Sequence, residues 1–189
     1  MLFNIFLALI PVATAFFLRK KLHVVLKILL FAIWFLFFPN TIYIITDLQY
    51  LPYQLQNSSL TFQILLTIQY MVLIIIGIIT FIVGFKAFEN IVTKYKIKGS
   101  AKGLLYIGIN FVFAFAVVLG KVQRTNSWDI FIDLPRVIRD IEKTIISTQL
   151  LFYVLLFGVI TNIIYFLFRD VLLMKNLIKK KKRVKKRRA

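Results

Sequence analysis

The stretch "LTFQILLTIQYMVLIIIGIITFIVGF", from Leu60 to Phe85, decides the fold, because it contains no charged side chain. The hydrocarbon core of a bilayer is about 30 Å thick, and about 20 apolar residues in a helix cross it. The segment is long enough to do so. Its apolar residues are continuous and do not alternate with a period of two, which disfavours a transmembrane β-barrel. The stretch therefore predicts a membrane-spanning helix.

Four further apolar segments flank this stretch, and together they predict an all-α polytopic transmembrane bundle of about five spans. The chain of 189 residues is 60% hydrophobic, with a mean hydropathy of +0.86, which is too apolar for a soluble domain. The first segment contains Pro11 and is followed, not preceded, by basic residues, so we expect an uncleaved span and not a signal peptide. The four segments are Leu2–Leu18, Leu22–Ile45, Gly103–Gly120 and Ile145–Phe168.

Basic residues alternate between the two sides of these spans. Residues 19–27 hold four Lys or Arg, residues 86–102 hold five, and the chain from Arg169 onward holds eleven. Residues 46–59 hold none, and residues 121–144 hold five beside four acids. Basic segments stay in the cytoplasm. We therefore expect a multi-pass protein of a bacterial cell membrane, with its N-terminus outside and its C-terminus in the cytoplasm.

The C-terminal fifteen residues, 175–189, contain ten basic side chains. We expect a cytoplasmic tail that follows an integral membrane domain of residues 1–174. Such a tail is attracted to anionic lipids. It has no interleaved aromatic residues and no recognisable binding fold, so membrane lipids, and not nucleic acid, are its expected partner.

A first polar motif, "FFPNTIYIITDLQY", ends the second apolar segment. On a helix, positions three and four apart share a face, so one stripe carries Asn40, Tyr43, Asp47 and Tyr50. Pro39 should loosen the backbone before this stripe, and Pro52 should end the helix after it. A carboxylate at a span is costly unless it is paired. Asp47 marks either the membrane–water boundary, with the tyrosines in an aromatic belt, or a functional site.

A second polar motif, "GKVQRTNSWDI", ends the fourth apolar segment and lies on the same expected face. Arg124 is the expected partner of Asp47, since a guanidinium can hold a carboxylate through two hydrogen bonds. Two polar clusters at one depth predict a single site. The motif supplies Lys121, Arg124, Asn126, Ser127, Trp128 and Asp129.

These two motifs resemble the hallmark segments of an uncharacterised bacterial integral-membrane family, catalogued as domain of unknown function number 1361. In the first motif the resemblance rests on Phe38, Pro39, Asn40, Tyr43, Thr46 and Asp47. In the second it rests on Gly120, Arg124, Asn126, Ser127, Trp128, Asp129 and Pro135. Lys121 stands where the family usually has Arg, and Thr125 where it has an aromatic residue. A Trp-Tyr-Asp-like segment after the first motif is missing. The resemblance implies a shared membrane architecture and no particular activity.

The segment "DIFIDLPRVIRDIEKTII" predicts a short amphipathic helix on the outer surface. Asp133 can cap it and Pro135 fits its first turn. Its apolar face comprises Leu134, Val137, Ile138, Ile141 and Ile145. The helix is either a lid over the polar site or a connector that covers the bundle.

The sequence excludes several chemistries. It has no cysteine and a single histidine, His23, so disulfides, thiolate metal sites and His-based metal sites are not expected. No phosphate-binding loop, nucleophile elbow or metalloprotease motif is present. We therefore expect no resident cofactor and no dedicated metal site, and the sequence identifies no catalytic residue.

Three functions remain open. In the first, the outer-face site binds a lipid headgroup or a partner protein, through the ligand-binding set Asn40, Tyr43, Asp47, Arg124, Asn126, Ser127, Trp128 and Asp129. In the second, an outer-leaflet enzyme acts on lipid-linked substrates, with Asp47 or Asp129 as general base or metal ligand and Arg124 as charge stabiliser. The third is a small transporter that forms homo-oligomers.

Overall fold

The computed structural model describes residues 2–56 and 58–186, with side chains described for residues 3–56 and 58–169. All regular elements of this part are helical: α1 (Leu2–Phe17), α2 (Val24–Phe37), α3 (Asn40–Thr46), the 3-10 helix η1 (Asp47–Tyr50), α4 (Leu51–Gln56), α5 (Leu60–Lys94), α6 (Gly99–Lys121), α7 (Asp129–Ile132), α8 (Leu134–Ile146) and α9 (Thr148–Lys186).

Four helical segments in this part of the chain are long and apolar enough to cross a membrane: Val24–Gln56, Leu60–Lys94, Gly99–Lys121 and Thr148–Arg169. The apolar helix α1 is shorter, with 16 residues, and at 1.5 Å per residue it measures about 24 Å. The prediction of an all-α membrane bundle is confirmed. The expected first span is a helix somewhat shorter than a hydrocarbon core.

Two predicted boundaries were wrong. The second span does not end at Ile45, because η1 and α4 continue the helical path to Gln56. Pro52 is the second residue of α4 and so lies in a first turn, where its missing N–H costs nothing; it starts a helix and does not end one. At the other end of the chain, Ile145 belongs to α8, and the last span begins at Thr148.

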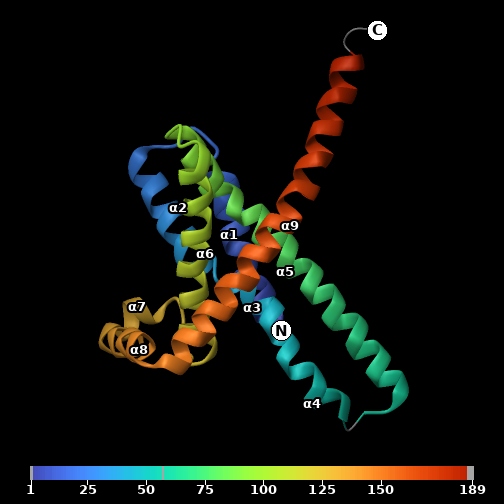
Figure 1. Ribbon diagram of the computed structural model, residues 1–189, viewed down its shortest axis with the longest axis vertical. Helices are drawn as coiled ribbons and strands as arrows, with labels where there is room; N and C mark the ends of the chain where they lie inside the picture. The colour runs from blue at the N-terminus through green and yellow to red at the C-terminus, as the bar shows by residue number, and fades with distance from the viewer. Residues whose placement is uncertain (1, 57, 187–189) are drawn as a thin grey trace.

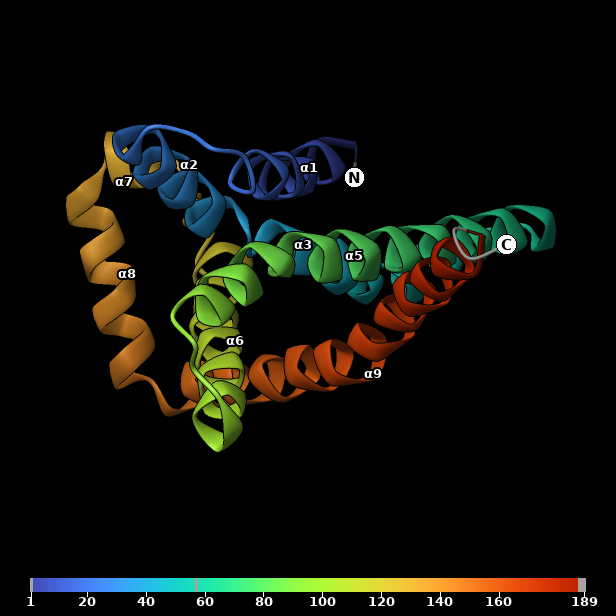
Figure 2. The same cartoon turned by 90° about the horizontal axis from the view of Figure 1, so that it is seen from above.

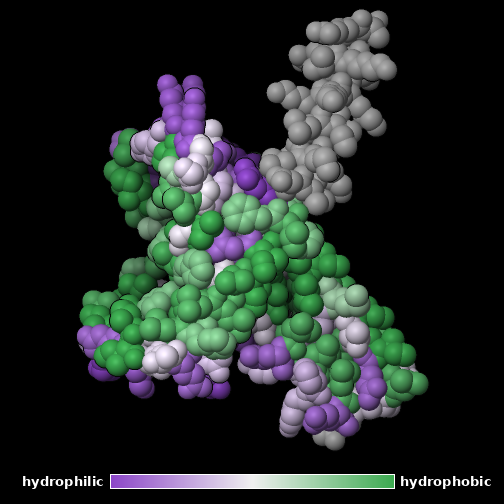
Figure 3. All heavy atoms as spheres, viewed as in Figure 1, coloured by the Kyte–Doolittle hydropathy of each residue, from purple (hydrophilic) through white to green (hydrophobic). Residues whose placement is uncertain are grey.

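The helices place their connections at two ends of the molecule. The α1–α2 and α5–α6 connections, which are rich in lysine, lie together at the top of Figure 1; we call this the basic end. The α4–α5 connection, α7 and α8 lie at the bottom, and we call this the motif end, because the second motif joins α6 to α7 there. Apolar residues cover most of the face between the two ends in Figure 3.

The helix α9 crosses the bundle and continues without a break past position 174. The expected division between a membrane domain and a tail is therefore not marked by a change of secondary structure in residues 148–186. The side chains of the predicted basic tail lie outside the described residues.

An aromatic core joins α2, α5 and α6. Trp34 is fully buried, and its indole N–H donates to the Gly84 carbonyl at 2.9 Å. The ring of Phe38 lies 4.4 Å from that of Phe113 and 5.1 Å from that of Trp34. Each buried ring removes a large apolar area from lipid or water and prefers such tilted contacts. This core fixes the end of α2 against α5 and α6.

The helices α6 and α9 pack closely, and a polar contact fixes their position along each other. Asn110 of α6 is fully buried and donates to the Asn162 side chain at 3.0 Å. A Cβ atom at Gly158 would overlap the Phe111 ring. Small residues and amide pairs are the usual means by which helices associate in lipid.

The amphipathic helix was predicted correctly. The Asp133 carboxylate accepts the Arg136 N–H at 3.1 Å, and Pro135 occupies the first turn of α8. Figure 1 shows α8 end-on and Figure 2 shows it lengthwise, so it lies across the motif end of the bundle. Val137 is buried, whereas Ile138 and Ile145 are exposed. The apolar face thus points partly into the bundle and partly outward.

We predict that Asp133→Ala frays the first turn of α8. Loss of an N-cap costs about 1 kcal/mol, which corresponds to about fivefold faster hydrogen exchange of the Arg136 amide. Exchange measured by mass spectrometry checks this. Glu142→Ala, which removes an exposed acid from the same helix, is the control and should leave that amide unchanged; equal exchange in both variants would contradict the cap.

Candidate functional site

The first motif is built around a break in a helix. The helix α2 ends at Phe37, and Pro39 precedes α3. The last carbonyls of a helix have no partner within it, and in an apolar environment each must find a donor elsewhere. Asn40 donates its side-chain amide to the Phe37 carbonyl at 3.0 Å. Thr41 donates its hydroxyl to the Phe38 carbonyl at 2.8 Å.

The second motif supplies a further donor at this break. The Ser127 hydroxyl donates to the Leu36 carbonyl at 2.7 Å, across 91 positions of sequence. Asn40 and Ser127 come from different motifs, but both donate a hydrogen bond to a carbonyl at the end of α2. Both are explained by the carbonyls that the break exposes.

An ion pair makes the second connection between the motifs. Asp47 is buried, and one of its oxygens pairs with the Lys121 ammonium group at the end of α6. Its other oxygen accepts the Asn4 side-chain amide of α1 at 2.9 Å. The Lys121 nitrogen also lies 5.0 Å from the centre of the exposed Tyr50 ring. One carboxylate thus ties α1, η1 and α6 together.

The expected pairing of Asp47 with Arg124 was wrong. Arg124 is exposed and has a left-handed backbone, with φ of 59°. The helix α6 ends at Lys121, so Arg124 lies beyond the end of this helix. Lys121, one helical turn earlier, is the residue that α6 directs at the carboxylate.

The Tyr43 side chain makes a third connection. Its hydroxyl donates to the Ala116 carbonyl of α6 at 3.0 Å. The hydroxyl lies so close to α6 that a Cβ atom at Gly120 would overlap it. The position of Tyr43 in the first motif therefore requires a residue without a side chain at Gly120 in the second motif.

The second motif also organises itself and α8. Asp129 is buried and accepts the Asn126 backbone N–H at 2.7 Å, which closes the turn. The Thr125 hydroxyl donates to the Asp140 carboxylate of α8 at 2.6 Å. Trp128 packs edge-on against Phe3 of α1, with ring centres 6.1 Å apart. The turn is thus held against α8 by Thr125 and against α1 by Trp128.

The two motifs line one cavity of about 230 Å³. Leu36, Pro39 and Tyr43 line it from the first motif side, and Thr125, Asn126 and Ser127 from the second. Residues of α6, α7 and α8 complete it; among them are Ala116, Val137 and Ile141. The wall is mainly apolar, with a polar edge formed by the second motif.

The structure gives the predicted site residues different positions at the motif end. Tyr43, Asn126 and Ser127 line the cavity. Asn40, Asp47 and Asp129 are buried and bound to protein partners, whereas Arg124 is exposed. In the part of the chain that the structure describes, no three His, Asp or Glu side chains gather where they could hold a metal ion. The carboxylates of Asp47 and Asp129 are both bound to donors of the protein itself.

Sequence reasoning missed Asn4 altogether. Its signal was present, since it is the first polar side chain in the apolar run of α1. Sequence reasoning also missed a network at the basic end, where Glu89 accepts from the Tyr165 hydroxyl at 2.5 Å and lies 3.1 Å from the Arg169 nitrogen Nε. These residues come from distant spans, and no spacing rule connects them.

Comparison with known proteins identifies the family of the chain. The family model described as "Protein of unknown function (DUF1361)" matches residues 3–164. The chain belongs to this family. The DUF1361 match includes α1 with Asn4, both motifs and most of the last span, and ends before the basic residues of the C-terminus. Neither the curated proteins nor the solved structures contain a significant match to the chain.

We predict that Gly120→Ala destabilises this DUF1361 protein by about 1–3 kcal/mol, the usual cost of overpacking a well-filled site. The added methyl group would force the Tyr43 hydroxyl away from the Ala116 carbonyl. Equilibrium unfolding in mixed detergent micelles measures the change.

The matched control is Gly103→Ala on the same helix, where a Cβ atom would meet nothing within 4 Å. Because alanine favours a helix more than glycine does, that variant should be as stable as the parent or up to about 1 kcal/mol more stable. Equal stability of the two variants would show that Tyr43 and Gly120 do not touch.

Proposed function

We propose that the protein is a non-enzymatic membrane protein that binds a lipid at the motif end, in the outer leaflet of the cell membrane. The proposed orientation has the N-terminus outside, because the basic connections lie at the opposite end of the bundle and basic segments stay in the cytoplasm. The motif end then faces outward.

The observation that carries this proposal is the cavity that the two motifs share. At about 230 Å³ it is smaller than the roughly 300–1,000 Å³ of pockets that enclose a whole small molecule. Its walls are mainly apolar side chains from α2, α6 and α8. Such a cavity suits a segment of a longer apolar chain, which is what a lipid offers.

The polar edge of the cavity suits a headgroup. Asn126 is exposed at this edge, and Arg124, two positions earlier, is exposed as well. A guanidinium beside an amide is a strong donor set for a phosphate group. The exposed apolar residues of α8, among them Ile138 and Ile145, suit a helix that lies at the membrane surface.

Catalysis by the two acids fits the geometry less well. Asp47 already accepts from Lys121 and Asn4, and Asp129 accepts from Asn126 within its own turn. A general base needs a carboxylate within hydrogen-bond reach of a substrate proton. Both carboxylates instead hold the protein together, so we assign them to the support of the site.

The test is labelling with a phosphatidylglycerol analogue that carries a photoreactive diazirine in its acyl chain. We expect the label on peptides from α6 and α8, located by mass spectrometry. Ala116→Leu adds three carbons to a wall of the cavity and should lower this labelling about fivefold or more, since about 1 kcal/mol of contact is lost.

Ala32→Leu makes the same change at an exposed position of α2 and should leave the labelling unchanged. In a second arm, Arg124→Gln should weaken labelling by the anionic analogue, whereas Arg139→Gln, an exposed arginine of α8, should not. Labelling that is equal in the Ala116 and Ala32 variants would contradict a lipid site and favour a partner protein at this surface.

A further inference from the structure

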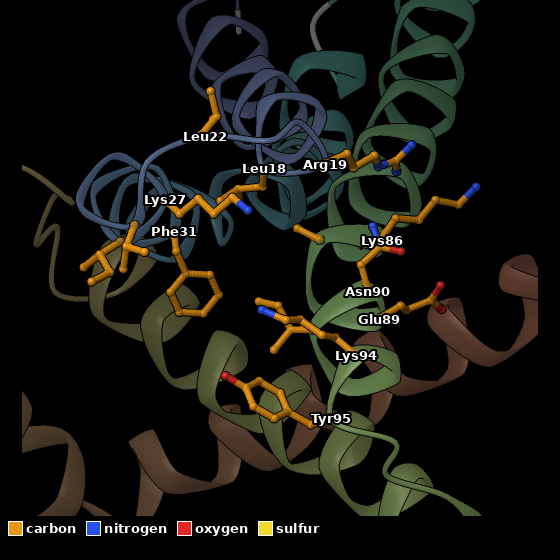
Figure 4. Close-up of a pocket in the computed structure, with 14 residues that line it drawn as sticks. Leu18, Arg19, Leu22, Lys27, Phe31, Lys86, Glu89, Asn90, Lys94 and Tyr95 are labelled. Atoms are coloured by element: carbon orange, nitrogen blue, oxygen red, sulfur yellow. The ribbon is translucent and has the colours of Figure 1, made fainter.

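A second cavity, of about 890 Å³, lies at the basic end, far from both motifs. The α1–α2 connection and α2 line one side of it, and the last turns of α5 line the other (Figure 4). Its volume is within the range of pockets that hold a whole ligand. The outer-face proposal does not involve this cavity.

The charged residues of the cavity are strongly biased towards one sign. In the part of the chain with described side chains, four cations line it: Arg19, Lys27, Lys86 and Lys94. In Figure 4, Lys27 from α2 and Lys94 from α5 point into the space between these helices from opposite sides. Asn90, which can donate two hydrogen bonds, also lines the cavity from α5, on the side of Lys86.

Among the residues whose side chains are described, Glu89 is the only acid that lines this cavity, and it does not balance these cations. Its carboxylate accepts from Tyr165 at 2.5 Å and lies 3.1 Å from the Nε atom of Arg169. Both partners come from α9, and in Figure 4 the Glu89 side chain turns towards that helix. The cavity therefore keeps an excess of positive charge, which attracts an anion.

Apart from Tyr95, the rest of the lining is apolar, and a site for a soluble anion would not need such a wall. The apolar part of the wall includes Leu18, Leu22, Val24, Ile28, Phe31 and Ile91. Val24 and Ile28 are 67% and 63% exposed, so the apolar wall continues onto the outer surface of α2. Hydrocarbon chains can enter along this surface without crossing water.

We propose that this cavity binds one anionic glycerophospholipid of the inner leaflet. Lys27 and Lys94 hold the phosphate from opposite sides, Asn90 donates to it, and the apolar wall takes the beginning of the acyl chains. This site is additional to the outer-face site, and either can exist without the other.

The experiment measures lipid affinity of the full-length protein in detergent by native mass spectrometry. The probes are phosphatidylglycerol, phosphatidylcholine with the same acyl chains, and glycerol 1-phosphate. Each basic side chain near an anionic surface contributes roughly fivefold in affinity. Lys27→Gln/Lys94→Gln should therefore weaken the tightest phosphatidylglycerol site about 10- to 30-fold, with little effect on phosphatidylcholine.

Lys21→Gln/Lys98→Gln is the matched control. It removes two exposed charges from the two connections at the same end, and neither residue lines the cavity. The basic C-terminus is present in every variant and contributes equally. We expect the control to bind like the parent protein. Equal weakening in both double variants would mean a diffuse charge effect and would overturn the proposal.

Two further results would overturn it. One is unchanged affinity in Lys27→Gln/Lys94→Gln; the other is glycerol 1-phosphate binding as tightly as the phospholipid. If the double variant does not fold, Asn90→Asp serves instead. This isosteric change at an exposed position places a carboxylate four residues from both Lys86 and Lys94, where it can pair with them. It should weaken phosphatidylglycerol binding at least about fivefold, and parent affinity would contradict the site.

Discussion

The carbonyl groups exposed where α2 ends at Pro39 are the constraint on which the motif end depends. A helix break in apolar surroundings is stable only if each freed carbonyl finds a donor. The Asn40 side chain satisfies the Phe37 carbonyl locally, and Ser127 satisfies the Leu36 carbonyl from the other motif. The Phe38 carbonyl accepts both the backbone N–H and the hydroxyl of Thr41. The first motif therefore cannot be satisfied by its own residues alone. This requirement brings the turn after α6 back to α2.

Once that turn is in place, the other connections follow. The Asp47–Lys121 ion pair and the Tyr43–Ala116 hydrogen bond hold α3 and η1 against the end of α6. Gly120 must lack a side chain because the Tyr43 hydroxyl occupies the space. Several polar residues that the sequence suggested as ligand contacts, such as Asp47 and Tyr43, thus bind other parts of the protein. The cavity between them is what remains for a ligand, and it is mainly apolar.

Much of the architecture could be predicted because lipid leaves few alternatives. Long apolar runs that cross lipid must be helices. For α8, Asp133 predicted the capping residue, and the spacing of the apolar residues predicted the helix. The junction of the two motifs was also predicted. Its pairing was not, because the choice between Lys121 and Arg124 depends on where α6 ends, with Lys121 in its last turn and Arg124 beyond it. The partners Asn4 and Glu89 depend on packing between distant helices, which no local pattern encodes.

The central claim is that the two motifs form one unit through a buried ion pair. A double-mutant cycle with Asp47→Asn and Lys121→Gln, followed by equilibrium unfolding in mixed micelles, tests it most directly. Residues in direct contact show coupling energies of about 0.5–3 kcal/mol, and for a pair this buried we expect a value of at least about 1.5 kcal/mol. The same cycle with Arg124→Gln in place of Lys121→Gln should give no coupling. Additive effects at Asp47 and Lys121 would contradict the account.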